Sequence, residues 1–354
     1  RRVEGRSAFV AALKEGQFDM ILADYSLPGF DGITALTLAL PARANDSEAA
    51  VAMGGIELVA NRHVSMDSED LFISEREVRV RYVYTNHSDK DLELTISFPL
   101  PPVRAADWEA YSYTAIPDFS TLKFKTTVDG KPVKLAMMKR AEAGGRDVTK
   151  RIQQLGWPLD WVDTSGEVPD FVKKLQPAER KAYAAEGLLT TTKNGDAYPA
   201  WDVVTHVTRK QVFPARRSVV VTHRYAPMLG GSVAGALYPE LRKEYPEHLK
   251  AYCIDKDFLA AFDRKFAARK RDPDAPLVYS ETWIGYILSS GRNWRGPIKD
   301  FRLVVDKGKP ENLVSFCMNG VKKISPTRFE VRRKNFEPKG DLEILIVKWP
   351  SSDE

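Results

Sequence analysis

One glycine-rich segment places a serine in a pattern typical of hydrolase nucleophiles. Gly230–Gly235 is Gly-Gly-Ser-Val-Ala-Gly, so Ser232 lies at the centre of a near match to G-x-S-x-G. Such a serine attacks an acyl carbon when it sits on a sharp strand-to-helix turn and a histidine accepts its proton. Ala234 stands where the second glycine of the pattern belongs. A hydrolase using Ser232 is one functional hypothesis, and a flexible loop after a strand is the alternative.

The histidines and carboxylates show no spacing that predicts a metal site or an acid–base pair. His206 and His223 lie on strands expected to pair, so they could meet, but two half-buried imidazoles explain the pattern equally well. No pair among the five histidines has the spacing of zinc ligands. Neighbouring carboxylates such as Glu69 and Asp70 are too common to indicate acid–base catalysis. We therefore predict no confident catalytic residue and no metal ligand.

A cluster of aromatic residues surrounds the first expected helical insertion. Its members are Trp157, Trp161, Tyr198 and Trp201. Aromatic side chains in such a cluster usually belong to a core, but insertions on a β-sandwich also shape binding faces. These four residues are therefore a candidate binding groove for a peptide, a glycan or an envelope protein.

The first forty residues alternate between helical and strand-like patterns. Gly5–Glu15 has a helical spacing of apolar residues, and Phe18–Ala23 is a short apolar run typical of a buried parallel strand. Asp24 follows at the carboxyl end of that run, before the loop Tyr-Ser-Leu-Pro-Gly-Phe-Asp-Gly. This order resembles the middle of a two-component response-regulator receiver domain, over residues 1–39. The resemblance implies that Asp24 is the phosphoacceptor and that the Ser26 carbonyl helps to bind Mg²⁺.

Phosphoryl transfer to an aspartate needs more than this segment supplies. The resemblance implies a metal site that also uses an acidic pair on an earlier strand, and a hydroxyl residue and a lysine on later strands. We therefore interpret residues 1–40 as a truncated receiver fragment that does not function. Phosphorelay signalling through Asp24 is the alternative function, and only in that case is a cofactor, Mg²⁺, expected.

Residues 41–45 form a junction that resembles a signal-peptide cleavage site. Ile33–Leu40 is a short apolar run, and Ala42-Arg43-Ala44 follows it with the A-x-A pattern. A receiver helix followed by a linker is the alternative, because no basic segment precedes the run. We expect a domain that is periplasmic or secreted in its native context to begin at Asn45. Expressed as written, without a signal peptide, it would be cytoplasmic.

From Asn45 onward the pattern is mainly that of β-strands. Glu77–Thr85 alternates apolar and charged side chains, and Asp129-Gly130 is a strong hairpin signal between two apolar runs. Short strands broken by glycine and proline turns predict a mainly β, α+β fold with an antiparallel sandwich-like body. Two helical insertions are expected, each with two helical segments: Val148–Leu155 with Pro177–Leu189, and Tyr238–Tyr252 with Asp257–Arg269.

Several short segments of this body carry a second resemblance. They include Met66-Asp-Ser-Glu-Asp-Leu, Phe98-Pro-Leu-Pro, Gly296-Pro-Ile-Lys-Asp-Phe-Arg-Leu-Val-Val-Asp-Lys-Gly and Val314-Ser-Phe-Cys. They resemble the bacterial family known as domain of unknown function 4424, over residues 45–349. Members typically carry signal peptides, so the resemblance implies an exported protein and no established activity. We expect one β-rich domain over residues 45–354, divisible into lobes at about 45–230 and 231–354.

Cys253 and Cys317 are the two cysteines of the chain. Neither belongs to a C-x-x-C motif, which would suggest redox catalysis or metal binding. If the domain is exported, oxidation is favoured and we predict a Cys253–Cys317 disulfide; two buried thiols are the alternative. The chain-entropy model gives roughly 4 kcal/mol of stabilisation for a loop of this size.

The composition excludes two other classes of function. A formal net charge of +5 over 354 residues is too weak for a nucleic-acid-binding surface. The sequence contains no run of about twenty apolar residues, so we predict no transmembrane segment. The preferred hypothesis is a non-catalytic, exported, β-rich binding or envelope-associated domain.

Overall fold

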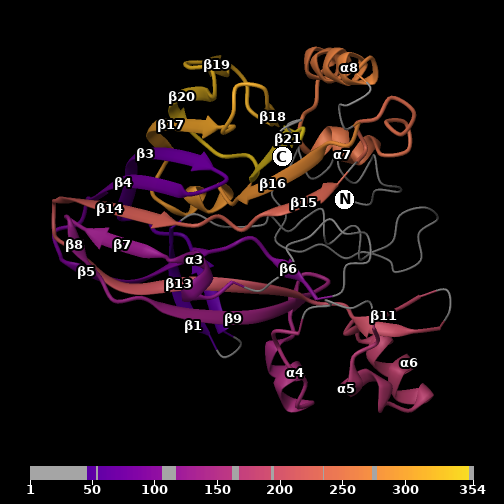
Figure 1. Ribbon diagram of the computed structural model, residues 1–354. Coiled ribbons are helices and arrows are strands. Elements are labelled where there is room, and N and C mark those ends of the chain that lie inside the picture. Colours follow the sequence, from indigo (N-terminus) through magenta and orange to yellow (C-terminus); the bar gives the residue numbers. More distant parts are fainter. Residues whose placement is uncertain are drawn as a thin grey trace, which may run out of the picture.

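The computed structural model describes residues 46–52, 55–105, 117–161, 167–192, 195–233, 235–272 and 277–350. Asp24, the rest of the predicted receiver fragment and the junction at residues 41–45 lie outside the described residues. Within the described part the protein is mostly β, as the alternating patterns predict. Three sheets form the body, and helices pack at two places on it (Figure 1).

The first sheet is antiparallel and has the strand order β10-β9-β13-β5-β1-β2, with β6 paired to β13. Its long strands β5 and β13 form its centre. The strands are β1 (Ser47–Ala52), β2 (Gly55–Val59), β5 (Leu92–Pro99), β6 (Val103–Arg104), β9 (Ala136–Ala143), β10 (Arg146–Asp147) and β13 (Asp202–Phe213).

The second sheet has the order β19-β20-β17-β3-β4-β14-β7-β8 and is antiparallel except where β17 lies parallel to β3. Its turn at Asp129-Gly130 has φ values of 47° and 78°, the pair of positive angles that a tight hairpin turn requires. The strands are β3 (Val64–Ser74), β4 (Val78–Asn86), β7 (Lys125–Val128), β8 (Lys131–Pro132), β14 (Ser218–Tyr225), β17 (Ile298–Asp306), β19 (Lys322–Lys323) and β20 (Arg328–Phe336). This sheet draws strands from both sides of residue 230.

The third sheet has the order β15-β16-β21-β18. Its strands are β15 (Gly230–Val233), β16 (Ser280–Tyr286), β18 (Leu313–Phe316) and β21 (Leu342–Lys348). One face of β16 and β21 joins the main core through Ile284, Ile344 and Ile346, and the other face packs under helices. Burial on both faces explains why residues 344–347 of β21 form a continuous apolar run instead of an alternating one.

Two groups of helices correspond to the two expected insertions. The first group contains α4 (Thr149–Gln154), α5 (Asp170–Lys173) and α6 (Pro177–Ala185), beside the small hairpin β11 (Leu189–Thr191) and β12 (Ala197–Pro199). The second contains α7 (Pro246–Ala251) and α8 (Lys256–Lys270), and the remaining helical turns are α3 (Phe119–Leu122) and the 3-10 helix η1 (Ser289–Asn293). Figure 1 shows the first group projecting from one end of the body and α8 lying over the third sheet. None of these helices is long and apolar enough to cross a bilayer.

A buried ionic cluster lies in the main core between the first and second sheets. The Arg209 guanidinium donates two hydrogen bonds to the Asp46 carboxylate, at 3.0 and 2.7 Å, and the His223 imidazole lies 3.1 Å from the same carboxylate. Thr126 bonds the other ring nitrogen of His223 at 2.8 Å. Asp46 therefore ties the start of the described chain to strands of both sheets.

Acid is expected to destabilise this core through its buried histidines. Burial lowers the pKa of His223 despite the nearby Asp46 carboxylate, and burial, with the Arg140 charge, lowers the pKa of His206 to about 3. Unfolded histidines bind protons below about pH 6.5, whereas these two stay neutral when folded, so stability should fall as the pH drops from about 7 to about 5. Urea unfolding at several pH values measures the slope. This slope is proportional to the number of protons that the protein takes up on unfolding, and His223→Gln and His206→Gln should each lower that number by about one. An unchanged slope in both variants would contradict this.

Candidate ligand-binding site

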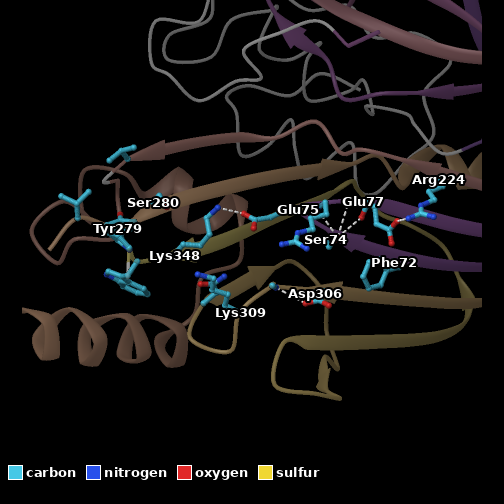
Figure 2. A pocket seen from close by; sticks show the side chains of 17 residues that line it. Phe72, Ser74, Glu75, Glu77, Arg224, Tyr279, Ser280, Asp306, Lys309 and Lys348 are labelled. Atoms are coloured by element: carbon cyan, nitrogen blue, oxygen red, sulfur yellow. Dashed lines mark hydrogen bonds and ion pairs between the residues drawn. The ribbon is translucent and has the colours of Figure 1, made fainter. Parts of the chain in front are cut away.

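A pocket of about 870 Å³ opens where the second and third sheets meet. It is bounded by the end of β3 and its turn into β4, the end of β14, the loop after β17, the start of β16 and the end of β21. Figure 2 shows an elongated site, with Tyr279 and Lys348 toward one end and Glu77 and Arg224 toward the other. The site therefore collects residues from segments that are far apart in the sequence.

The turn between β3 and β4 is fixed by Ser74. The Ser74 hydroxyl accepts hydrogen bonds from the backbone N–H groups of Arg76 and Glu77, at 3.3 and 3.2 Å, and donates one to the Glu77 carbonyl at 3.1 Å. These local bonds replace the sheet ladder at the tip of the hairpin. Glu75, Arg76 and Glu77 are consequently held at the mouth of the pocket.

The loop after β17 is fixed by a buried lysine. The Lys307 ammonium group donates hydrogen bonds to the carbonyls of Pro310, at 2.7 Å, and of Asn312. The Asn312 side chain in turn donates to the Lys307 carbonyl at 2.8 Å, and Gly308 adopts a φ of +82°. This closed set of bonds presents the exposed Lys309 side chain to the pocket on a preformed loop.

The aromatic wall of the pocket rests on α8. Trp349 lies against Phe262 of α8, with 5.3 Å between ring centroids, and the ammonium group of Lys265 lies 5.6 Å from the Trp349 ring centroid. Arg269 of α8 also donates a hydrogen bond of 2.8 Å to the carbonyl of Pro350. The position of the Trp349 and Pro350 wall therefore depends on the position of this helix.

The three lining carboxylates all face basic side chains. Lys348 lies 2.6 Å from Glu75, Arg224 lies 2.7 Å from Glu77, and Arg328 lies 2.9 Å from Asp306. Partial burial would raise the pKa of Asp306, but the hydrogen bonds from Arg328, the Gly308 N–H and Thr327 together outweigh this and leave the pKa below its ordinary value. Asp306 is therefore ionised at neutral pH and poorly suited to proton transfer.

Basic side chains outnumber acidic ones in the lining of the pocket. Its lining contains four bases (Arg76, Arg224, Lys309 and Lys348) and three acids (Glu75, Glu77 and Asp306). Two further ammonium groups, those of Lys307 and Lys265, lie directly behind this lining. Burial, reinforced by the charges of Lys323 and Lys265 and only partly offset by the charge of Glu311, lowers the pKa of Lys307. An anionic group in the pocket would relieve this repulsion.

The structure places the predicted nucleophile, Ser232, within strand β15, directly opposite Glu281 of β16. This is a strand position, and not the strand-to-helix turn of a nucleophile elbow. The Glu281 carboxylate accepts hydrogen bonds from the Tyr279 hydroxyl, at 3.2 Å, and the Trp283 indole, at 2.9 Å, and the His248 ring nitrogen Nε2 lies 3.0 Å from it. Glu281 thereby connects α7 to the third sheet. The hypothesis that Ser232 is a hydrolase nucleophile stays a prediction.

The four predicted groove residues lie in or beside the core under α4–α6. Trp201 is fully buried, Trp157 is 9% exposed and their rings stack at 6.2 Å, while Tyr198 is 4% exposed. Trp161 is partly buried at the edge of this core. Their role in binding stays a prediction. In the part of the chain that the structure describes, no group of three or more His, Cys, Asp or Glu side chains is placed to hold a metal ion.

The predicted disulfide is present. Cys253 and Cys317 are bonded, with 5.0 Å between their Cα atoms. Sequence reasoning missed the pocket itself, although the segment ending in Asp306-Lys307-Gly308, which carried the family resemblance, forms one of its edges. No sequence pattern marks Lys309 or Trp349 as a binding residue, because the pocket that they line is formed by segments that only the fold brings together.

The family model described as "Domain of unknown function (DUF4424)" matches residues 44–345. The chain belongs to this family. A solved structure from Legionella pneumophila subsp. pneumophila str. Philadelphia 1, described as a candidate nutrient binding protein, aligns over 86% of this chain and 70% of that chain, with 13% sequence identity and a TM-score of 0.41. A search of the curated proteins found no match. The receiver resemblance of residues 1–39 and a phosphorelay role for Asp24 stay predictions, since the family match begins at residue 44 and the structure describes no residue before 46.

Proposed function

We propose that this family member is a non-catalytic, exported binding domain that holds a partly apolar anion in the pocket between the second and third sheets. The observation that carries the proposal is the pairing of a basic lining, in which the preformed loop after β17 presents Lys309, with the aromatic wall at Trp349. Ligand sites typically combine apolar surface with a few fixed polar groups that set orientation. The basic lining would hold the anionic group, and the aromatic wall would hold the apolar part.

Two further observations support this function. The lining carboxylates face basic partners, which favours binding over acid–base chemistry. The disulfide supports an exported protein, because disulfides persist in oxidising compartments.

The proposal predicts that Lys309→Glu weakens binding of an aromatic sulfonate. The probe is 8-anilinonaphthalene-1-sulfonate, titrated by fluorescence, and the expected change is about tenfold in Kd, or roughly 1.4 kcal/mol. The wild-type affinity should also fall with added salt, because the lysine is exposed and its charge is screened. Circular dichroism of each variant shows whether the fold is retained.

Two controls separate pocket binding from general dye binding. Lys131→Glu makes the same charge change at an exposed position on the edge strand β8 and should leave the sulfonate affinity unchanged. The neutral probe N-phenyl-1-naphthylamine should bind Lys309→Glu and wild type alike. Equal weakening by Lys309→Glu and Lys131→Glu, or equal loss of both probes, would contradict the proposed anion site.

A further inference from the structure

The Cys253–Cys317 disulfide lies on the surface of the molecule. Both cysteines are exposed, and both line a second hollow of about 680 Å³ together with residues of β18 and the loop that follows it. A structural disulfide is normally protected by burial, whereas thiol–disulfide exchange requires a thiolate to reach one sulfur along the S–S axis. The location of this bond therefore permits attack in the folded protein.

The backbone at Cys253 is unusual for a cysteine. Cys253 has a φ of +49°, and it ends α7 in a left-handed position that glycine normally occupies. The N–H groups of Ile254 and Cys253 bond the carbonyls of Leu249 and Lys250, at 2.9 and 3.1 Å, which fixes this helix end. Side chains other than glycine are disfavoured in this conformation. A residue that is disfavoured at this helix end therefore supplies one sulfur of the exposed disulfide.

The disulfide is connected to the ligand pocket through α8. Cys253 lies two residues before Asp255, whose side chain caps the start of α8 at 2.7 Å. The same helix supports the Trp349 wall through Phe262 and holds Pro350 through Arg269. The other cysteine, Cys317, follows β18, which pairs with β21, the strand that leads into Trp349.

We propose that Cys253–Cys317 is a thiol-exchange site, which a dithiol reductant opens in the folded protein and whose state sets the packing of the pocket's aromatic wall. A thiolate of the dithiol attacks one protein sulfur and forms a mixed disulfide, and the other protein sulfur leaves as a thiolate and takes up a proton. The second thiol of the dithiol, as its thiolate, then resolves the mixed disulfide, so that the dithiol is oxidised to a disulfide. The protein gains two electrons and two protons and ends with two thiols.

Reduction leaves hydrogen bonding between the two segments in place. The Ser315 hydroxyl donates a hydrogen bond of 2.8 Å to the carbonyl of Tyr252, so β18 stays bonded to the end of α7. The expected change is therefore a looser α8 and a looser Trp349 wall, with the sheets intact. The part of the proposal that concerns ligand binding rests on the proposed function, and the exchange chemistry does not.

The exchange chemistry is tested by treating the native protein with dithiothreitol and trapping thiols with a maleimide. We expect both cysteines to be labelled without denaturant while the circular dichroism spectrum is retained, and reoxidation by oxidised dithiothreitol to restore the bond. Reduced glutathione should give a mixed disulfide detectable by mass spectrometry. Labelling that appears only in denaturant would overturn the proposal.

The coupling is tested with the sulfonate probe on oxidised protein, reduced protein and the Cys253→Ser/Cys317→Ser variant. We expect the last two to bind about fivefold more weakly than oxidised protein, at the lower end of ordinary coupling between sites. Dithiothreitol should have no effect on the double variant. Equal affinity in all three would overturn the coupling.

A readout without ligand distinguishes failure of this inference from failure of the proposed function. Amide hydrogen exchange at Trp349 and in α8 should become faster on reduction, while exchange in β3 and β4 stays unchanged. If Lys309→Glu leaves sulfonate binding intact but exchange at Trp349 and in α8 is still faster on reduction, the proposed anion site fails and the redox coupling stands. If exchange at Trp349 and in α8 does not change, the coupling fails whatever the probe does.

Discussion

Asp46→Asn is expected to lower the free energy of unfolding by about 3–5 kcal/mol, the usual cost of removing one partner from a buried ion pair. The side chains of Asp46 and Arg209 are 0% and 1% exposed. Asparagine has nearly the same volume, so the change removes the charge without opening a cavity. The buried guanidinium of Arg209 is then left without its counter-ion, which urea unfolding monitored by tryptophan fluorescence should register as a lower midpoint.

The electrostatics of the cluster support a large effect. Burial alone would raise the pKa of Asp46, but the charge of Arg209 and the hydrogen bonds from Arg209 and His223 lower it well below its ordinary range. The carboxylate is therefore more stable as an anion in the folded protein than in the unfolded chain. The contribution of Asp46 to the free energy of unfolding is present at neutral pH. It is lost only in acid below about pH 4, where an unfolded aspartate takes up a proton.

Asp89→Asn is the matched control. Asp89 forms an ion pair of similar length with Arg216, at 2.7 Å, but both side chains are exposed to solvent. Exposed pairs contribute little because water and salt screen them, so this variant should unfold like the wild type. If Asp46→Asn were no more destabilising than Asp89→Asn, the buried pair would not be what joins the first strand to the core.

Local patterns predicted much of this fold. The alternation of Glu77–Thr85 corresponds to β4, Val78–Asn86, and the expected helix at Asp257–Arg269 corresponds to α8. Such elements follow from side-chain periodicity along one segment, so the sequence is sufficient to find them. The disulfide was predictable for a different reason, since the chain offers a single pair of cysteines.

The site could not be predicted in the same way. The parallel pairing of β17 with β3 places Asp306 opposite Ser74, and no pattern within either segment indicates that neighbour. The buried cluster was missed for a related reason. Arg209 lies on the same strand as His206, β13, but only the approach of Asp46 from the start of the described chain makes its burial favourable.

Trp201→Ala is expected to lower the free energy of unfolding by about 3–5 kcal/mol, the range for removing a buried tryptophan side chain. Trp201 is fully buried at the centre of the small core under α4–α6, and its indole donates a hydrogen bond of 3.1 Å to the carbonyl of Leu159. Trp157 stacks on one side of it, and Phe171 lies 6.5 Å away. The surrounding side chains relax only partly into a cavity of this size, so the expected loss is large.

The measurement is urea unfolding, with hydrogen exchange to locate the effect in α4–α6. Trp161→Ala is the control: its ring lies at the edge of the same core and is only partly buried, so the expected loss is about 1 kcal/mol. The comparison of Trp201→Ala with Trp161→Ala also tests the predicted groove, because a ring without exposed surface, such as that of Trp201, cannot contact a ligand. If Trp201→Ala unfolded like the wild type, the ring would be dispensable for packing, and its place in a binding groove would regain support.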